Sequence, residues 1–175
     1  LLPHKLSHLG PAISTGDVNG DQLEDFFIGN ASGSSGSLFI QNEDGHFFTQ
    51  EGPWENDILY EDAGSLLFDA DQDEDLDLYV VSGGNEFPED SKSYMDRLYI
   101  NDGKGNYSKS ESALPEITTS GSCVESIDFD NDGDMDLFVG GRHIPHRYPF
   151  PAKSYLLENK SARGIVKFED VTSEI

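Results

Sequence analysis

The stretch that decides the fold is an acidic loop running directly into an apolar segment: Asp128-Phe129-Asp130-Asn131-Asp132-Gly133-Asp134-Met135-Asp136, then Leu137-Phe138-Val139-Gly140. The same arrangement occurs twice more. Asp17–Asp25 precedes the apolar run Phe26–Gly29, and Asp69–Asp77 precedes Leu78–Val81. Three copies in register predict a repeat protein, in which each repeat is one supersecondary unit.

Two further elements follow each acidic loop in the same order. The first is an apolar segment ending in a polar residue, found at Leu38–Asn42, Leu98–Asn101 and Tyr155–Asn159. The second holds an aromatic residue, at Gly45–Thr49, Gly105–Lys109 and Val166–Asp170. The whole unit therefore repeats, and not the acidic loop alone.

Each unit is typical of four short strands. One strand precedes the acidic loop, as at Gly64–Phe68 and Val124–Ile127, and an apolar, aromatic or β-branched strand follows it. Asn42–Gly45 and Asn101–Gly103 are hairpin turn signals between the third and fourth strands. No segment has a sustained helical period. We predict an all-β chain of three β-propeller blades, each of four antiparallel strands, over residues 1–51, 52–110 and 111–175.

Composition excludes several classes of protein. The 175 residues carry a formal charge of −23, which disfavours nucleic acid and anionic membrane surfaces as partners. No apolar run approaches the roughly 20 residues of a spanning helix. Aromatic residues make up 11%, which argues against a disordered acidic tail. Cys123 is the only cysteine, so intrachain disulfides and cysteine-rich zinc sites are excluded; we expect it to be a small buried hydrophobe.

The acidic loops are suited to a hard cation. Oxygen-bearing side chains at positions 1, 3, 5 and 9 turn inward onto one point, and a backbone carbonyl at position 7 completes the set. Ca²⁺ takes six to eight oxygens in irregular geometry, whereas Mg²⁺ prefers few carboxylates and several waters. We therefore predict up to three calcium ions, held by Asp17, Asn19, Asp21, Leu23 and Asp25; by Asp69, Asp71, Asp73, Asp75 and Asp77; and by Asp128, Asp130, Asp132, Asp134 and Asp136.

These loops are not EF-hands. An EF-hand needs a bidentate Glu at position 12, and this chain has Ile28, Val80 and Val139 there. The alternative, three solvated acidic turns, is disfavoured by the three copies in register. Position 6 is Gln22, Glu74 and Gly133 in the three loops. Because glycine adopts positive φ without strain, we expect the third loop to be the most relaxed and the most fully occupied.

The quoted motifs resemble a known family. Asp17–Asp21, Asp130–Gly140 and Leu98–Tyr107 are similar to FG-GAP/VCBS repeats, the calcium-binding blades of integrin α-subunit propellers. Phe168–Thr172 and Gly140–Tyr155 are more similar to the ASPIC/UnbV group, which includes cartilage acidic protein. The resemblance covers nearly the whole chain. It implies a propeller, usually of seven blades, located outside the cytoplasm, with side-chain ligands at positions 1, 3, 5 and 9 of each loop.

A partner is expected on the face opposite the acidic loops. The connections between second and third strands differ in length: 30–37, 82–96 and 141–153. Variable loops on a repeat scaffold are where binding usually occurs. The last loop is basic, aromatic and proline-rich; it either seals the gap between blades or recognises an anionic or carbohydrate ligand. The candidate ligand-face residues are Tyr94, Arg142, His143, Arg147 and Tyr148.

The sequence as a whole indicates a calcium-stiffened extracellular, cell-surface or periplasmic module for protein or glycan binding and adhesion. It carries no nucleophile elbow or helical zinc motif, so we expect no enzyme; the alternative is a carbohydrate-processing enzyme or accessory domain. Trp54 is expected to be a packing anchor rather than a sugar platform. Three blades leave two exposed flanks. We expect the chain, which starts at Leu1, to be part of a longer propeller, or copies to associate at these flanks.

Overall fold

A computed structural model describes residues 11–173 of the chain. These residues form three four-stranded antiparallel sheets, each a meander in which successive strands are neighbours. The first sheet holds β1 (Ile13–Gly16), β2 (Asp25–Ile28), β3 (Ser37–Gln41) and β4 (Phe47–Gln50). The second holds β5 (Asp62–Phe68), β6 (Asp77–Ser82), β7 (Arg97–Asn101) and β8 (Tyr107–Ser110). The third holds β9 (Gly121–Ile127), β10 (Asp136–Gly141), β11 (Tyr155–Asn159) and β12 (Phe168–Asp170).

The predicted all-β fold of four-stranded antiparallel blades is thus confirmed, and the sheets are blades of a partial β-propeller. Short 3-10 helices occur only in connections of the described part, η1 (Pro53–Asn56) and η2 (Lys92–Tyr94). The expected unit boundaries after residues 51 and 110 stay a prediction, and residues 1–10 of the first unit lie outside the described residues.

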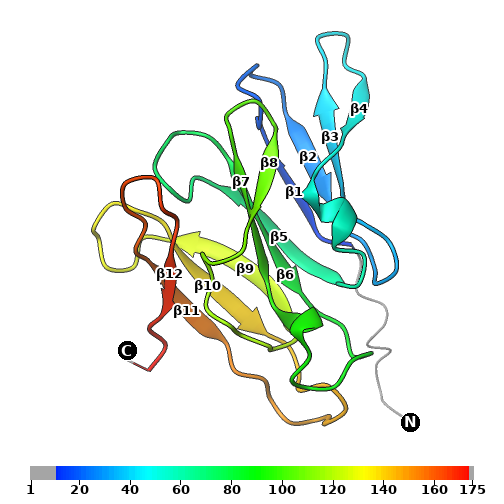
Figure 1. Cartoon of the computed structure of the whole chain (residues 1–175), viewed down its shortest axis with the longest axis vertical. Helices are drawn as coiled ribbons and strands as arrows, with labels where there is room; N and C mark the ends of the chain where they lie inside the picture. Colours follow the sequence, from blue (N-terminus) through cyan, green and yellow to red (C-terminus); the bar gives the residue numbers. More distant parts are fainter. Residues whose placement is uncertain (1–10, 174–175) are drawn as a thin grey trace.

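The three sheets lie side by side in chain order, from the blue and cyan sheet at upper right to the yellow and red sheet at lower left (Figure 1). The first strands form the contact line between them, since β5 contacts both β1 and β9. Asp62, at the start of β5, links two blades. Its Oδ2 accepts a hydrogen bond from the N–H of Asn30 at 2.8 Å. Its Oδ1 accepts one from Nη2 of Arg97 at 2.7 Å, in a buried ion pair.

The core lies between the sheets because alternate residues of each middle strand face opposite neighbours. On β6, Leu78 and Val80 belong to the apolar cluster shared with the first sheet, while Tyr79 and Val81 belong to the cluster shared with the third. All four are buried. The second sheet is therefore covered on both faces, as a blade inside a propeller must be.

The outward faces of the first and third sheets are not covered by any sheet of residues 11–173. We call the outward face of the third sheet, formed by Cys123, Glu125, Ile127 and Phe138, the last flank. Phe138 corresponds in register to the fully buried Tyr79, yet it is 43% exposed. The outward face of the first sheet, the first flank, carries Phe26, whose ring stacks on Phe39 at 4.8 Å and meets Phe47 edge-on at 4.9 Å.

The expectation of a buried Cys123 is wrong. Cys123 is a free, exposed cysteine. It lies on β9 with the same alternation as Glu125 and Ile127, so its side chain belongs to the last flank. A residue type that is usually buried is exposed here because no fourth sheet packs on this face among the described residues.

Trp54 is the packing anchor that the sequence predicts. Only 2% of its surface is exposed. Its ring centroid lies 5.5 Å from that of Phe27, 5.8 Å from Tyr99 and 5.5 Å from Tyr107. Trp54 thus joins the first and second sheets through edge-on and tilted aromatic contacts.

Candidate metal centre

The three acidic loops each join the first strand of a sheet to the second, so they lie at the same end of the three sheets (Figure 1). Their backbones also follow the same path. Positions 4 and 6 have positive φ in every loop, at Gly20 and Gln22, at Gln72 and Glu74, and at Asn131 and Gly133. Gln22 (φ 69°) and Glu74 (φ 72°) adopt at position 6 the conformation that Gly133 (φ 98°) adopts without a Cβ. The loop path therefore does not depend on glycine.

The position-9 aspartates, Asp25, Asp77 and Asp136, are fully buried and organise each loop. One oxygen of each accepts the backbone N–H of position 2 of its own loop, at 3.1 Å in all three. The other oxygen accepts the backbone N–H at the end of the third strand, at 2.7 to 2.8 Å. Each aspartate thus fixes its loop to the third strand of its own sheet.

The position-1 aspartates hold the loop turns in the first two copies. Asp17 accepts backbone N–H groups from Gly20 at 2.8 Å and Gln22 at 2.7 Å. Asp69 accepts those of Gln72 at 2.7 Å and Glu74 at 3.1 Å. Asp128 differs, because its Oδ1 is buried and has no hydrogen-bond partner.

Two of the loops bring carboxylates together as a cation site requires. Carboxylate oxygens of Asp69, Asp71 and Asp77 lie within 4.8 Å of one another, and so do those of Asp128, Asp130 and Asp136. In the first loop Asn19 occupies position 3, and its Nδ2 donates to Oδ2 of Asp21 at 3.0 Å. The structure thus gathers the predicted ligands of positions 1, 3 and 9 in the second and third loops.

The chemistry of these groups fits Ca²⁺. Buried carboxylate oxygens without a hydrogen-bond partner occur in both loops, namely Oδ1 of Asp71, Asp75, Asp128 and Asp134. A buried acceptor without a donor is costly, and a hard cation would satisfy several at once. The residues that would hold it are those at positions 1, 3, 5 and 9, with the position-7 carbonyl. Bound there, Ca²⁺ would supply charge neutralisation and cross-linking.

Burial and neighbouring negative charges raise the pKa values of aspartates in the second and third loops. Burial, opposed by the backbone N–H groups of Asn101 and Ala70, raises the pKa of Asp77 to about 7. Burial and the neighbouring Asp73 raise the pKa of Asp75 to about 6. In the third loop, burial and the charge of Asp132 raise the pKa of Asp134 to about 6. These carboxylates lack a neutralising charge, which is what a bound cation provides.

The comparisons with known proteins agree with this geometry. Residues 69–139 match the family model described as FG-GAP-like repeat. The match starts at the first residue of the second acidic loop and ends on β10, after the third loop. Together with the three antiparallel sheets, it supports an FG-GAP repeat fold for this chain. A search of curated proteins found none that matches the chain significantly.

Two hydrogen-bonding residues of the site were not predicted as such. Asn101 and Asn159, at the ends of β7 and β11, bond to the backbone of acidic loops in neighbouring sheets. The signal is present in the sequence, because both residues end the same repeated segment. The corresponding residue of the first sheet is Gln41.

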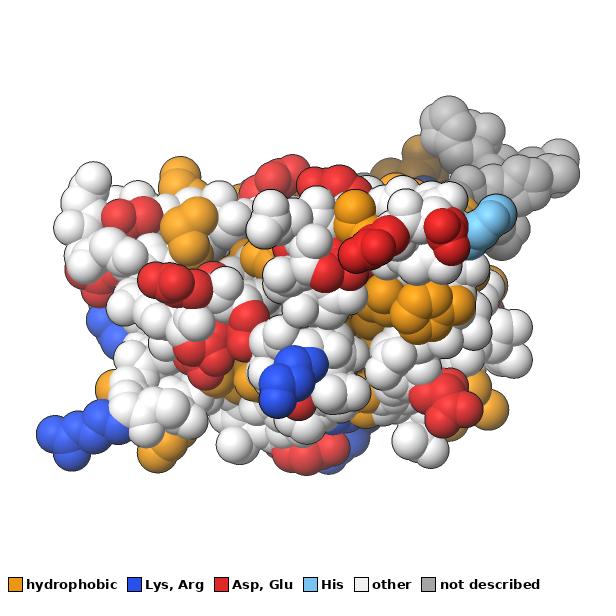
Figure 2. All heavy atoms as spheres, turned by 90° about the horizontal axis from the view of Figure 1, so that it is seen from above, with side chains coloured by type: hydrophobic (Ala, Val, Ile, Leu, Met, Phe, Trp, Pro, Cys, Tyr) orange, Lys and Arg blue, Asp and Glu red, His pale blue; other side chains and the backbone are white. Residues whose placement is uncertain are grey.

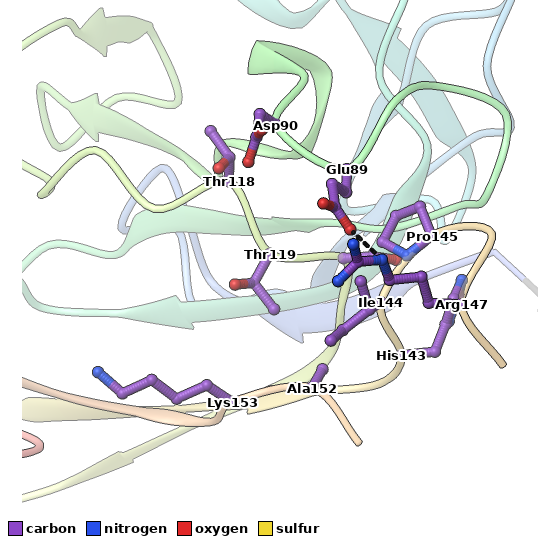
Figure 3. Close-up of a pocket in the computed structure, with 11 residues that line it drawn as sticks. Glu89, Asp90, Thr118, Thr119, His143, Ile144, Pro145, Arg147, Ala152 and Lys153 are labelled. Atoms are coloured by element: carbon purple, nitrogen blue, oxygen red, sulfur yellow. Dashed lines mark ion pairs between the residues drawn. The ribbon is translucent and has the colours of Figure 1, made fainter. Parts of the chain in front are cut away.

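The opposite face is formed by the connections after β6 and β10. Arg147 Nε pairs with Glu89 Oε2 at 3.1 Å, and the His146 N–H donates to Oδ1 of Asn85 at 2.9 Å. The two loops are thus tied to each other. Beside them lies a cavity of about 320 Å³, lined by residues including Thr118, His143 and Arg147 (Figure 3).

The predicted ligand-face residues differ in accessibility. Arg147 and Tyr148 are exposed, and Arg142 is half-buried with its Nη1 buried and unpartnered. His143 is 5% exposed and lines the cavity. Tyr94 is fully buried, and its hydroxyl bonds to both the N–H and the C=O of Phe87 at 2.9 Å. The expectation that Tyr94 lies on the ligand face is therefore wrong: its side chain is buried beneath its own loop and is not on the surface.

Proposed function

We propose that the chain is a calcium-binding module of an extracellular β-propeller, in which up to three ions stiffen the blades and another face binds a partner. One observation carries the calcium role. Carboxylate oxygens converge within 4.8 Å in two equivalent loops, where some are buried without hydrogen-bond donors. The ions have a structural role, and the module binds rather than catalyses.

Calorimetric titration of the whole chain with Ca²⁺ and with Mg²⁺ tests the metal. We expect Ca²⁺ binding at two to three sites and much weaker Mg²⁺ binding, because the donors are mainly carboxylates in irregular loops. Asp71→Ala and Asp130→Ala should each remove one site, since each deletes a member of one carboxylate cluster. The control is Asp44→Ala, which removes an aspartate from a hairpin turn outside the acidic loops. Unchanged stoichiometry in both loop variants would rule out these sites.

An extracellular location is part of the same proposal, and the sequence resemblance to extracellular FG-GAP and ASPIC/UnbV proteins supports it. Separately, no helix among residues 11–173 is long and apolar enough to cross a membrane. Extracellular modules bind calcium with a Kd of about 10⁻⁴ to 10⁻³ M. A measured Kd in this range is the expected result, whereas nanomolar affinity would favour a role inside the cell.

We further propose that the partner, a protein or a carbohydrate, binds on the face of the loops after β6 and β10. The cavity that Arg147 lines supports this surface, and Arg142 is a second basic residue of the same loop. An arginine fork can hold a carboxylate or sulfate with two hydrogen bonds. The surface seen from above in Figure 2 carries many acidic side chains and few basic ones. Because the whole chain has 11 Lys and Arg against 34 Asp and Glu, two arginines in one loop on the opposite face are unusual.

A glycan array together with protein capture tests this face. The Arg142→Ala/Arg147→Ala variant should lose binding of any captured ligand while it keeps its calcium-dependent melting. The matched control is Lys104→Ala, in an exposed hairpin turn. If the double variant instead melts at a far lower temperature, the loop serves mainly to hold two blades together. The ion pair between Arg147 and Glu89 is compatible with that role as well.

The two flanks are proposed to meet further blades, or a second copy of this chain. The first flank presents stacked aromatic rings, and the last flank presents Ile127 and Phe138. Apolar residues at the corresponding positions of the second sheet are buried by its neighbours. Mass measurement in solution tests this proposal: self-association would support flank contacts between copies, and a stable monomer would require other blades to cover them.

A further inference from the structure

A continuous series of buried hydrogen bonds connects the three acidic loops. The carboxylate of Asp77 lies at the middle of this series. The Ala70 N–H donates to Oδ2 of Asp77 at 3.1 Å, and the Asn101 N–H donates to Oδ1 at 2.8 Å. One carboxylate thus holds both its own loop and the end of β7.

The side chain of Asn101 extends the series to the first sheet. Its Nδ2 donates to the carbonyl of Val18 at 2.8 Å. Val18 is position 2 of the first acidic loop, and its own N–H donates to Oδ2 of Asp25 at 3.1 Å. Both Asn101 and Val18 are buried, so water does not compete for this bond.

The same pattern recurs between the second and third sheets. Nδ2 of Asn159 donates to the carbonyl of Ala70 at 2.9 Å, and its N–H donates to Oδ1 of Asp136 at 2.7 Å. Ala70 is therefore held from two sides, by Asp77 of its own loop and by Asn159 of the next sheet. We call this series, from Asp25 through Asn101, Asp77 and Asn159 to Asp136, the amide relay.

We propose that the amide relay couples the acidic loops, so that a cation bound in one loop raises the cation affinity of its neighbour. The inference rests on the proposed calcium role and adds regulation to it. A cation at Asp136 would order the third loop and the end of β11. That ordering fixes the Asn159 side chain on Ala70 and so lowers the entropic cost of ordering the second loop. Coupling of this kind is reciprocal between the two loops.

The sign of the effect separates the relay from simple electrostatics. Two cations in neighbouring loops repel each other, and this repulsion alone makes the second binding event weaker. The relay predicts the opposite, namely positive cooperativity that depends on Asn101 and Asn159. Neither asparagine is one of the loop residues proposed to hold calcium, so changing it leaves every proposed ligand in place.

The test is a calcium titration of the ¹⁵N-labelled full chain, followed by NMR at the amides of Gln72 and Asp73 in the second loop. Asp130→Ala disables the third loop. In an otherwise unchanged chain, it should weaken calcium binding at the second loop about five-fold, the lower end of typical coupling. In an Asn159→Ser background, where serine is too short to reach Ala70, Asp130→Ala should leave the second loop unaffected.

The matched control is Asn42→Ala. Asn42 caps a hairpin through its side-chain oxygen, as Asn159 does, but makes no bond to another sheet. This change should keep the five-fold dependence. If Asn159→Ser does not fold, Asn101→Ser combined with Asp21→Ala gives the same cycle between the first and second loops.

The outcomes separate the two proposals. If calcium shifts no loop amide, the calcium role fails and the coupling fails with it. If the loops bind calcium but Asp130→Ala leaves the second loop unchanged or tighter in the chain with Asn159 intact, the relay alone is overturned. Coupling that persists in the Asn159→Ser chain would also overturn it.

Discussion

The buried carboxylate of Asp77 and the backbone N–H of Asn101 form a 2.8 Å hydrogen bond that ties the second acidic loop to the end of β7, the neighbouring strand of its own sheet. Equivalent bonds join Asp25 to Gln41 and Asp136 to Asn159. The position-9 aspartate is therefore a structural residue of each blade as well as a proposed calcium ligand.

Asp77→Ala should destabilise the chain even without calcium. It leaves the N–H groups of Ala70 and Asn101 buried without an acceptor, at about 1–3 kcal/mol each, so we expect a loss of roughly 2–4 kcal/mol in denaturant unfolding with chelator present. Asp73→Ala, in an exposed position of the same loop, should then cost little. Equal losses for both variants in chelator would contradict the structural role.

Trp54→Ala should be among the most destabilising single changes. It removes a buried ring that contacts Phe27, Tyr99 and Tyr107, and such cavities cost about 3–5 kcal/mol. Phe48→Ala, at a ring that is 51% exposed, is the control and should cost far less. Urea denaturation of both variants checks this, and a small loss for Trp54→Ala would mean that the first two sheets are not held together there.

The stability of the calcium-free chain should fall as pH rises from 4 to 7, partly because of Asp96. Burial raises its pKa to about 6, although the Ser82 N–H and the Tyr79 hydroxyl both donate to it at 2.7 Å. A carboxyl group whose pKa is raised on folding stabilises the fold below its unfolded pKa, and this contribution is lost as pH passes the folded value.

The raised pKa of Asp96 corresponds to about 3 kcal/mol of stability at low pH, and because the residue is only part-buried, solvent screening reduces this to roughly 1–2 kcal/mol. Asp96→Asn should remove this part of the pH dependence, measured by urea unfolding at pH 4 and pH 7 in chelator. An unchanged slope would show that Asp96 does not titrate in this range.

Cys123 reports directly on the last flank. As a free, exposed thiol it should react fully with a thiol reagent in the folded chain. If this flank associates with another blade or a second copy, the reaction should slow as that contact forms, for example with increasing protein concentration. A folded chain whose thiol is protected at every concentration, including high dilution, would contradict the exposed flank.

Much of the fold could be predicted from the repeat itself. The loop–strand–strand–strand order predicted the number and pairing of the strands, and Trp54 was correctly predicted to be a packing anchor. The exposure of Cys123 could not be predicted in this way. Burial at an outward-facing position depends on whether a neighbouring sheet is present, and the local sequence does not record that.

The site was predicted in its ligands but not in its connections. Alternating acidic residues indicated the loops, because ligand spacing is a local property. The bonds from Asn101 to Val18 and from Asn159 to Ala70 join residues more than 80 positions apart, and only the packing of neighbouring sheets brings them together. Tyr94 was similarly misplaced, since its loop folds back over it to bond with Phe87.

The central claim is that calcium in the acidic loops stabilises the blades, and thermal unfolding with and without chelator tests it most directly. At a free concentration 100-fold above Kd, each site adds about 2.7 kcal/mol, or roughly 5–10 °C in Tm. We expect EDTA to lower the Tm of the chain, added Ca²⁺ to restore it, and the Asp21→Ala/Asp71→Ala/Asp130→Ala variant to show neither effect. A Tm that is the same in EDTA and in calcium, or an equal calcium response in the triple variant, would contradict the account.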